Sequence, residues 1–387
     1  MRLPQKRGKI DEAEAISQIR YAIDHGVNYV DTAPPYHAGE SERLLGKALQ
    51  DGYRERVKVA TKLTHFMLQE PEDMDKMLNM QLSKLQTDHI DYYLLHSLEA
   101  NSWNKLQSFN VLKFLDKAKA DGKIVNLGFS FHGSRATFKE IIEANDWTMC
   151  QIQYNFLDEK RQAGTEGLQY AASKKLAVMI MEPLRGGALA GKVPKDVQKI
   201  YDNTKTGRSA AEWGLRWVWN HPEVTVVLSG MSDLAQVEEN IRTAETALPN
   251  SMSQADLSVI NSAASSYSHL MKVPCTGCGY CMPCPNGVDI PYNFNIYNQY
   301  NMFGNKIYTR GMYAVTLMGL MGRERSDASL CIKCGACAKK CPQNIAIPDE
   351  LRAVKSNLGG MRTKIMLPVI KRMVKRQFTT KIEEPTK

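Results

Sequence analysis

Four side chains suited to acid–base chemistry stand near the ends of three successive apolar runs. Asp31 ends the first run, Lys62 lies near the end of the second and His96 near the end of the third. Tyr36 follows Asp31 after two prolines, which predict a stiff, extended loop. A free tyrosine has a pKa of about 10, so it is a poor acid at neutral pH unless its neighbours assist it.

The four residue types complement one another. An ammonium at Lys62 stabilises a phenolate at Tyr36 and lowers its pKa, while a carboxylate at Asp31 fixes the lysine. Tyr36 could then protonate a carbonyl oxygen as hydride reaches the carbon, with His96 orienting that oxygen. Taken singly, each residue has a structural alternative, such as a helix cap or a core histidine. Their placement at successive strand ends favours a catalytic site.

The elements that must position this set alternate along the chain. Runs rich in β-branched and apolar residues predict strands at 26–32, 57–63, 90–97, 124–130, 149–155, 176–184 and 224–231. Between them, helical spacing is clearest at 12–26, 72–86, 108–122 and 208–221. This alternation indicates the α/β class and, at this length, a (β/α)8 TIM barrel over residues 1–265. Polar residues at the C-terminal strand ends then share one face.

One strand of such a barrel is missing from the pattern. Only a few residues precede the first predicted helix, so we expect the first strand to be truncated. Either residues 1–5 are its remnant, or the start of this sequence is internal to a longer natural chain.

The motifs DTAPPY, TK and LLHS resemble those of the aldo-keto reductase superfamily, over roughly residues 1–246. The resemblance implies a nicotinamide cofactor and assigns its contacts to Ser130, Gln151, Met181, Gly230, Ser232, Gln236, Glu239 and Asn240. Met181 stands where many members have a tyrosine that stacks on the nicotinamide. Phe131 stands where many members have an asparagine. Gly230 and Gln236 stand where others carry cations for the 2′-phosphate of NADPH, and Asp233 would repel that phosphate. We therefore expect NADH to be favoured.

Eight of the nine cysteines fall in two runs, at 275–285 and 331–342. The second run is C-x2-C-x2-C-x3-C-P, the bacterial ferredoxin spacing, in which the fourth cysteine ligates the other cluster. This pattern predicts two [4Fe-4S] clusters. One is assigned to Cys275, Cys278, Cys281 and Cys341, and the other to Cys331, Cys334, Cys337 and Cys284. Structural zinc sites use separated CxxC pairs instead, and disulfides are rare in cytosolic chains.

The segment between the cysteine runs is too long for a hairpin and predicts helices. Residues 266–350 resemble an α-helical dicluster ferredoxin domain, and the chain as a whole resembles the iron-sulfur branch of the aldo-keto reductases. Cys150 stands alone in a predicted strand and suits a buried apolar thiol.

Residues 351–387 carry ten Lys or Arg and two Glu, most of the chain's net charge of +9. Helical spacing predicts a basic amphipathic helix with Pro368 in its first turn. Such a helix can lie on an anionic membrane, dock an acidic redox partner or pack on its own protein. One basic helix offers no nucleic-acid reading element. Without a signal-peptide core or a spanning apolar stretch, we expect a cytoplasmic protein, with the tail able to hold it peripherally at a membrane.

Three functions remain open. The leading hypothesis is an oxidoreductase that couples carbonyl or alcohol hydride chemistry on a small substrate to the clusters. Because a hydride carries two electrons and a cluster accepts one, a second hypothesis is an electron-transfer protein with flavin or another redox cofactor in the barrel. The third is a non-catalytic sensor that binds nicotinamide.

Overall fold

The computed structural model describes residues 1–191, 193–275, 277, 279–320 and 324–378, with side chains up to residue 372. These residues form two compact units. The first unit comprises Met1–Gly191 and Arg208–Leu257, and the second comprises Ser258–Arg376 together with Lys192–Gly207.

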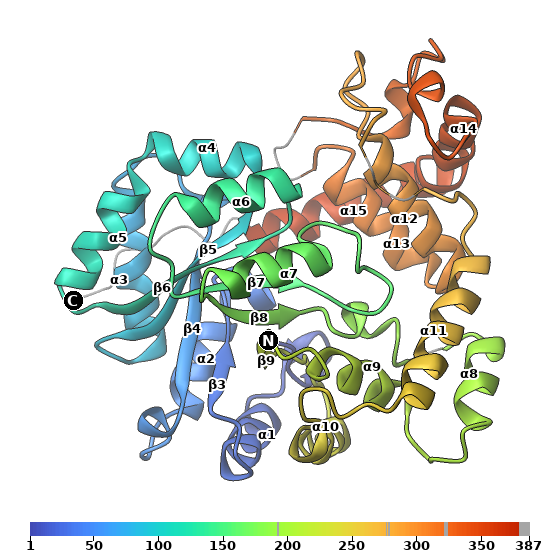
Figure 1. The fold of residues 1–387 in the computed structure, drawn as a ribbon. Helices are drawn as coiled ribbons and strands as arrows, with labels where there is room; N and C mark the ends of the chain where they lie inside the picture. The colour runs from blue at the N-terminus through green and yellow to red at the C-terminus, as the bar shows by residue number, and fades with distance from the viewer. Residues whose placement is uncertain (192, 276, 278, 321–323, 379–387) are drawn as a thin grey trace. The chain divides into compact units, whose positions relative to one another are not determined.

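A curled sheet of seven parallel strands forms the centre of the first unit (Figure 1). In chain order and in sheet order the strands are β3 (Tyr29–Asp31), β4 (Lys58–Leu63), β5 (Ile90–Leu98), β6 (Ile124–Phe131), β7 (Met149–Gln153), β8 (Ala177–Met181) and β9 (Val224–Val227). Ala60, Leu94, Met149 and Met179 form one buried cluster. Their strands are apolar because both faces are covered. All seven predicted strands are confirmed.

Helices precede, separate and follow the strands, and they cover the sheet (Figure 1). They are α1 (Glu12–Asp24), α2 (Ser41–Ala48), α3 (Asp73–Leu85), α4 (Ala100–Ser108), α5 (Val111–Ala120), α6 (Arg135–Glu143), α7 (Gly164–Ser173), α9 (Ala210–Trp219) and α10 (Leu234–Thr246). Several begin at a capping side chain, as where Asp11 accepts a hydrogen bond from the Glu14 amide and Ser209 one from the Glu212 amide. The four clearest predicted helices are confirmed.

The first residues do not supply the missing strand. Gln5–Lys6 (β1) and Lys9–Ile10 (β2) pair with each other as a short antiparallel hairpin. Among the described residues, no strand bridges β3 and β9. The expectation that residues 1–5 are a remnant of the eighth strand is therefore wrong, since the Asp11 amide bonds back to Pro4 and closes a hairpin. α1, which precedes the edge strand β3, and α10, which follows the edge strand β9, contact each other.

The second unit is mainly helical. It contains α8 (Lys195–Asp202), α12 (Ile290–Met302), α13 (Lys306–Thr316), α14 (Ile347–Leu358) and α15 (Met361–Phe378), while α11 (Gln254–His269) spans the boundary in sequence. Val273, Phe294, Tyr313 and Leu351 belong to its core. Pro368 lies inside α15, not in the first turn as predicted, because the helix begins at Met361. No helix in the described part of the chain has the length and apolarity needed to cross a membrane.

Candidate active site and cysteine cavities

The fold brings the four predicted acid–base residues together. Asp31 ends β3, Lys62 lies near the end of β4 and His96 near the end of β5, and these strands are neighbours in the sheet. Because parallel strands end at the same face, all three side chains lie at one mouth of the sheet. Tyr36 opens the short helix η1 (Tyr36–Gly39) directly after β3, and its ring lies at the same place.

Lys62 is the centre of the set and is fully buried. Its Nζ donates to Asp31 Oδ2 at 2.6 Å and to the Thr32 carbonyl at 2.8 Å. The same ammonium lies 5.1 Å from the centroid of the Tyr36 ring. Burial alone would lower the pKa of Lys62, but Asp31 and Tyr36 outweigh it and hold that pKa above its usual value. The lysine is therefore a fixed cation beside the phenol.

The acidity of Tyr36 differs from the expectation. Burial raises its pKa, and the opposing pull of Lys62 is too small to bring it below the ordinary value. The sequence argument identified the correct neighbour but omitted the cost of burying a phenolate, so a net lowering of the pKa is wrong. Tyr36 is thus a protonated phenol at neutral pH.

His96 faces Tyr36, with ring centroids 6.1 Å apart and planes at 81°. Burial, with Lys62 as the next contributor, holds the pKa of His96 well below its usual value, so the ring is neutral. Thr64 Oγ1 lies 2.9 Å from His96 Nδ1. If the threonine hydroxyl donates this bond, Nε2 carries the proton and can donate to a substrate oxygen.

The loop that presents Tyr36 is not extended. Pro35 has a helical backbone (φ −78°, ψ −7°), and the Tyr36 amide donates to the Ala33 carbonyl at 3.1 Å. The two prolines therefore make a tight turn, and the predicted extended loop is wrong. Because proline fixes φ but not ψ, the sequence did not distinguish these conformations.

Three of the proposed nicotinamide contacts lie on neighbouring strands. Ser130 pairs in register with Gln151 between β6 and β7, and Met181 follows on β8. Ser130 Oγ accepts a hydrogen bond from the Ser97 amide at 2.6 Å. Gln151 is buried and its Nε2 lies 3.5 Å from Met181 Sδ, while its Oε1 has no partner among the described residues. An orphaned buried acceptor fits the N–H group of a carboxamide.

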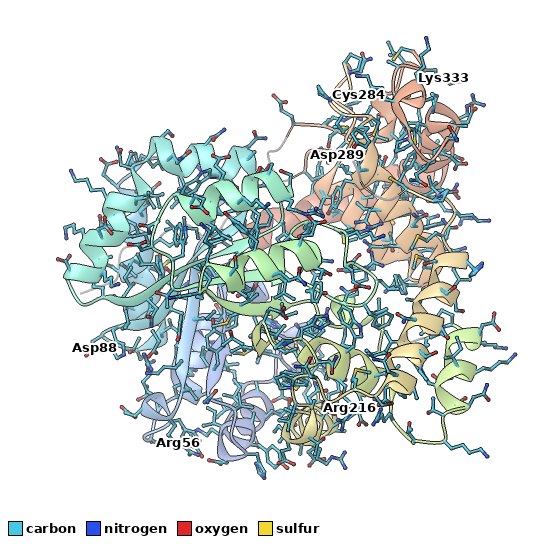
Figure 2. All side chains as sticks on the ribbon, viewed as in Figure 1. Arg56, Asp88, Arg216, Cys284, Asp289 and Lys333 are labelled. Carbon is cyan, nitrogen blue, oxygen red and sulfur yellow. The ribbon has the colours of Figure 1, made fainter. Side chains whose placement is uncertain are left out.

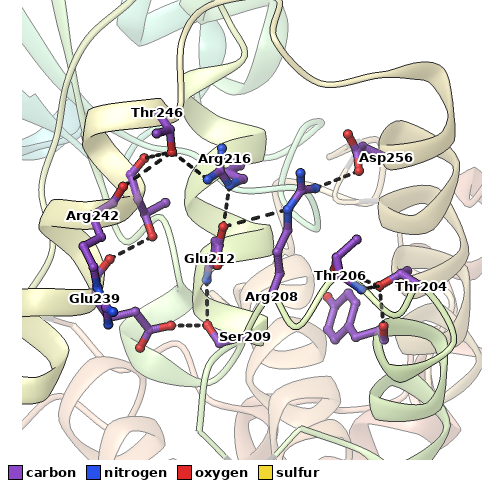
Figure 3. Close-up of polar contacts among 12 residues, drawn as sticks. Thr204, Thr206, Arg208, Ser209, Glu212, Arg216, Glu239, Arg242, Thr246 and Asp256 are labelled. Carbon is purple, nitrogen blue, oxygen red and sulfur yellow. Dashed lines mark hydrogen bonds and ion pairs between the residues drawn. The ribbon is translucent and has the colours of Figure 1, made fainter.

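The remaining predicted contacts lie after β9 and on α10, at the sites of Gly230, Ser232, Gln236, Glu239 and Asn240. Asp233 caps α10, and both its carboxylate oxygens accept bonds from Gln236. Figure 3 shows Glu239 bonded to Ser209 at the start of α9. Asn240 Nδ2 donates to Ser229 Oγ at 3.0 Å. The segment is therefore held by its own hydrogen bonds.

Arg2 is a cation that the sequence analysis missed. Its guanidinium donates to the Gly186 carbonyl at 2.7 Å, in the loop after β8. A Cβ placed on Gly230, after β9, would lie only 2.8 Å from the Arg2 Cγ. Loops after the last two strands of (β/α)8 barrels often hold phosphate, so Arg2 lies where such a group would bind. No spacing in the sequence connects residue 2 with these loops.

A buried polar network behind Lys62 was also missed. Glu42 is fully buried, and its Oε1 accepts bonds from Thr61 Oγ1 at 2.6 Å and from Gln81 Nε2 at 2.9 Å. Gln81 also donates to the Lys62 carbonyl at 3.0 Å, and Tyr93 donates to Gln81 Oε1 at 2.8 Å. The network ties α2 and α3 to the backbone of Lys62.

The cysteines of the second unit surround two cavities. Cys275, Cys281 and Cys341 line one cavity. Cys281, Cys284, Cys331, Cys334 and Cys337 line the other. Cys284 is labelled in Figure 2. Cys278 lies outside the described residues. Each cavity thus contains cysteines from both runs, as a crossed arrangement requires. Among the described residues, no three His, Cys, Asp or Glu side chains are placed to hold a single metal ion.

Residues 1–257 match the Aldo/keto reductase family, which covers more than half of the chain. The chain belongs to this family. Residues 274–346 match the 4Fe-4S dicluster domain. The protein is therefore an aldo/keto reductase-family oxidoreductase with a C-terminal dicluster domain.

Two relatives resemble about two thirds of this reductase. It is 24% identical over 308 residues to the NADH-specific methylglyoxal reductase of Escherichia coli, a match that covers 67% of this chain and 90% of the relative. It is 26% identical over 291 residues to the aldo-keto reductase YhdN of Bacillus subtilis, covering 65% and 85%.

Solved structures share the fold. The aldo-keto reductase AKR11C1 of Bacillus halodurans in its holo form superposes with a TM-score of 0.56 at 23% identity, covering 65% of this chain and 88% of that one. An aldo-keto reductase of Klebsiella pneumoniae in complex with NADPH gives a TM-score of 0.55 at 23% identity, covering 67% and 89%. The expected TIM-barrel-like class is confirmed.

Proposed function

We propose that this reductase reduces a small carbonyl, or oxidises the corresponding alcohol, at Asp31, Tyr36, Lys62 and His96, and exchanges the electrons with two [4Fe-4S] clusters. The observation that carries the proposal is the buried Lys62, whose ammonium contacts Asp31 at 2.6 Å and stands beside the Tyr36 ring. An ammonium fixed next to a protonated phenol and a neutral imidazole is an arrangement for donating a proton to oxygen.

The chain's own residues handle the proton and the substrate oxygen. Tyr36 donates its hydroxyl proton to the carbonyl oxygen, and Lys62 stabilises the phenolate that results. His96 Nε2 donates a hydrogen bond that holds the same oxygen. Bound nicotinamide supplies the hydride. Ser130 and Gln151 would hold its carboxamide, for which the orphaned Gln151 Oε1 is suited.

NADH is the proposed nicotinamide. Asp233 carries its negative charge at the start of α10, and Gln236 is bonded to it rather than free to meet a 2′-phosphate. Without a charge-assisted contact to its 2′-phosphate, NADPH loses about 1.5 to 3 kcal/mol of binding free energy. Arg2 packs against Gly230, and Arg242 is exposed on α10. These two cations are the ones to substitute if NADPH proves to be preferred.

The two cysteine cavities support crossed cluster ligation. Cys275, Cys278, Cys281 and Cys341 would hold one cluster, and Cys331, Cys334, Cys337 and Cys284 the other. The clusters supply one-electron carriers, and thiolates are the ligands that such clusters use.

The test is anaerobic purification followed by cofactor analysis and turnover. Released cofactor is separated by HPLC, and a panel of small aldehydes, ketones and quinones that begins with methylglyoxal is assayed with NADH and with NADPH. NADH-dependent reduction of a carbonyl is the expected result. Stoichiometric flavin without carbonyl turnover would favour an electron-transfer protein instead. Nicotinamide binding without turnover would favour a sensor.

A further inference from the structure

We propose that the exposed surface of the second cysteine run docks an acidic one-electron carrier protein. This surface, here called the lysine face, consists of Ile332, Lys333, Cys334, Lys339 and Lys340. The inference rests on the proposed function, because it requires the cluster assigned to this run. It adds the partner with which that cluster exchanges electrons.

The charged residues of the lysine face are all positive, and no ion pair among the described residues neutralises them. Lys333, Lys339 and Lys340 are all exposed, and none has an ion pair or side-chain hydrogen bond in the described part of the chain. No acidic residue occurs between Cys331 and Cys341. The first cysteine run, at 275–285, has no charged residue at all. The positive charge therefore lies on the second run, where Lys333 and Lys340 line the cavity proposed for its cluster.

An apolar side chain lies within this charge. Ile332 is 67% exposed, although a large aliphatic side chain normally gains free energy from burial. Weak electron-transfer complexes use small interfaces in which charges steer the encounter and a few apolar groups make contact. An isoleucine flanked by lysines fits a partner with the opposite charge and a small apolar centre.

The lysine face also borders the cavity proposed for the cluster. Lys333, Lys340 and Ile332 line the same cavity as Cys284 and Cys331. Lys333 and Cys284 lie at the same end of the second unit in Figure 2. Cys334 is itself exposed. A partner bound to the lysines would therefore lie next to the cluster ligands, where electron transfer is fastest.

The electron transfer balances without another reactant. A reduced [4Fe-4S]⁺ cluster returns to the oxidised [4Fe-4S]²⁺ state and gives one electron to the oxidised carrier. In the reverse direction the reduced carrier gives that electron to the cluster. No proton or bond is exchanged at the lysine face.

The test uses the anaerobic holoprotein and an acidic plant-type [2Fe–2S] ferredoxin as the probe. Binding is measured by isothermal titration calorimetry at low and at high salt. The variant K333E/K339E/K340E is compared with K113E/K119E/K175E, which makes the same charge change at three exposed lysines of the barrel unit. We expect the lysine-face variant to bind about tenfold more weakly or worse at low salt, and the control to stay within about twofold of the parent.

A second readout separates this inference from the barrel chemistry. The clusters are reduced with dithionite, excess reductant is removed, and the rate of carrier reduction is followed by stopped flow. Iron content and EPR establish that each variant keeps its clusters. A slow rate in the lysine-face variant alone supports the docking surface, even if no carbonyl is ever turned over. Failure of the proposed carbonyl chemistry would instead appear only in the nicotinamide assays.

Several outcomes would overturn the inference. Equal binding by both variants removes the lysine face as the docking site, as does binding that does not weaken with salt. A parent protein without iron removes it together with the cluster assignment. Vesicles containing phosphatidylserine are tested in parallel. If the lysine-face variant loses vesicle binding but still binds the ferredoxin, the surface is a membrane site.

Discussion

At the scale of single residues, Tyr36 depends on two opposing effects. Burial raises the pKa of its hydroxyl, whereas Lys62 stabilises the phenolate that forms when the proton leaves. A phenol with a raised pKa is a weak acid in the ground state, so its proton should move only as negative charge develops on the substrate oxygen. The hydroxyl would then matter for the transition state and little for binding.

The first prediction therefore concerns Tyr36→Phe. We expect kcat for carbonyl reduction to fall by about 10² to 10⁴, while the Kd for NADH stays nearly unchanged. Steady-state kinetics and fluorescence titration measure the two quantities. Tyr21→Phe, at a partly buried position of α1, is the control for loss of a tyrosine hydroxyl. A Tyr36→Phe enzyme as active as the parent would remove Tyr36 as the acid.

The second prediction is a pH profile. His96 must be neutral, and its pKa lies below 6.5, whereas Tyr36 must be protonated, and its pKa lies above 10. We expect kcat for reduction to be flat from about pH 6.5 to 9, because neither group titrates there. Lys62→Met removes the group that lowers the pKa of Tyr36, so kcat should fall without a new break in this range. A break near neutral pH in the parent would contradict the assigned protonation states.

At the scale of elements, the strand ends were predictable and their supports were not. Asp31, Lys62 and His96 follow apolar runs, and parallel topology places the ends of such runs together. Glu42 carries no such signal, since a glutamate early in a helix usually faces solvent. Only its contacts with α3 and β4 reveal that it is buried. Arg2 was missed for the same reason, because its partners are distant in sequence.

The third prediction tests the Glu42 network by stability. Burial raises the pKa of Glu42 above its ordinary 4.5, so the folded state binds its proton more tightly than the unfolded state does. Its destabilising effect is absent below pH 4.5 and grows as the pH rises toward the raised pKa. Glu42→Gln keeps the acceptor for Thr61 and Gln81 without the charge. We expect it to raise Tm at pH 8 by a few degrees, corresponding to ~1 kcal/mol, and to do less at pH 5.

Calorimetric scans of parent and variant at both pH values measure this difference. Glu245→Gln, at an exposed position of α10, is the control for removing a carboxylate. If Glu42→Gln raises Tm more at pH 5 than at pH 8, the folded state stabilises Glu42 as the anion.

The fourth prediction concerns the two cysteine runs as elements. Their spacing predicted shared ligation, and the cavity lined by Cys275 and Cys281 also contains Cys341 from the other run. Cys341→Ser should therefore disturb the cluster held mainly by the first run. EPR of the dithionite-reduced variant and its iron content, about eight per parent chain, measure the effect. Cys150→Ser, far from both runs in sequence and buried in β7, is the control. Loss confined to the signal of the other cluster would refute the crossed assignment.

At the scale of the whole molecule, the cofactors proposed for the two units can be compared by the number of electrons that each carries. A hydride carries two electrons, and each of the two proposed [4Fe-4S] clusters would accept one, so together they would match one nicotinamide. The equal electron counts permit hydride transfer to be coupled to the clusters. They do not provide the step that divides the two electrons of a hydride between one-electron carriers. A flavin or a radical-competent intermediate would be required for that step.

The fifth prediction turns this count into a titration. If the barrel delivers its electrons to the clusters, anaerobic NADH should bleach the visible absorbance with an end point of about one NADH per chain. Bound flavin would take two further electrons and move the end point to about two. Cys341→Ser, having lost one cluster, should finish at about half an equivalent in the absence of flavin. Dithionite, which needs no hydride acceptor, gives the full bleaching for comparison. No bleaching by NADH, in protein that dithionite does bleach and that still reduces a carbonyl, would mean that the two units work separately.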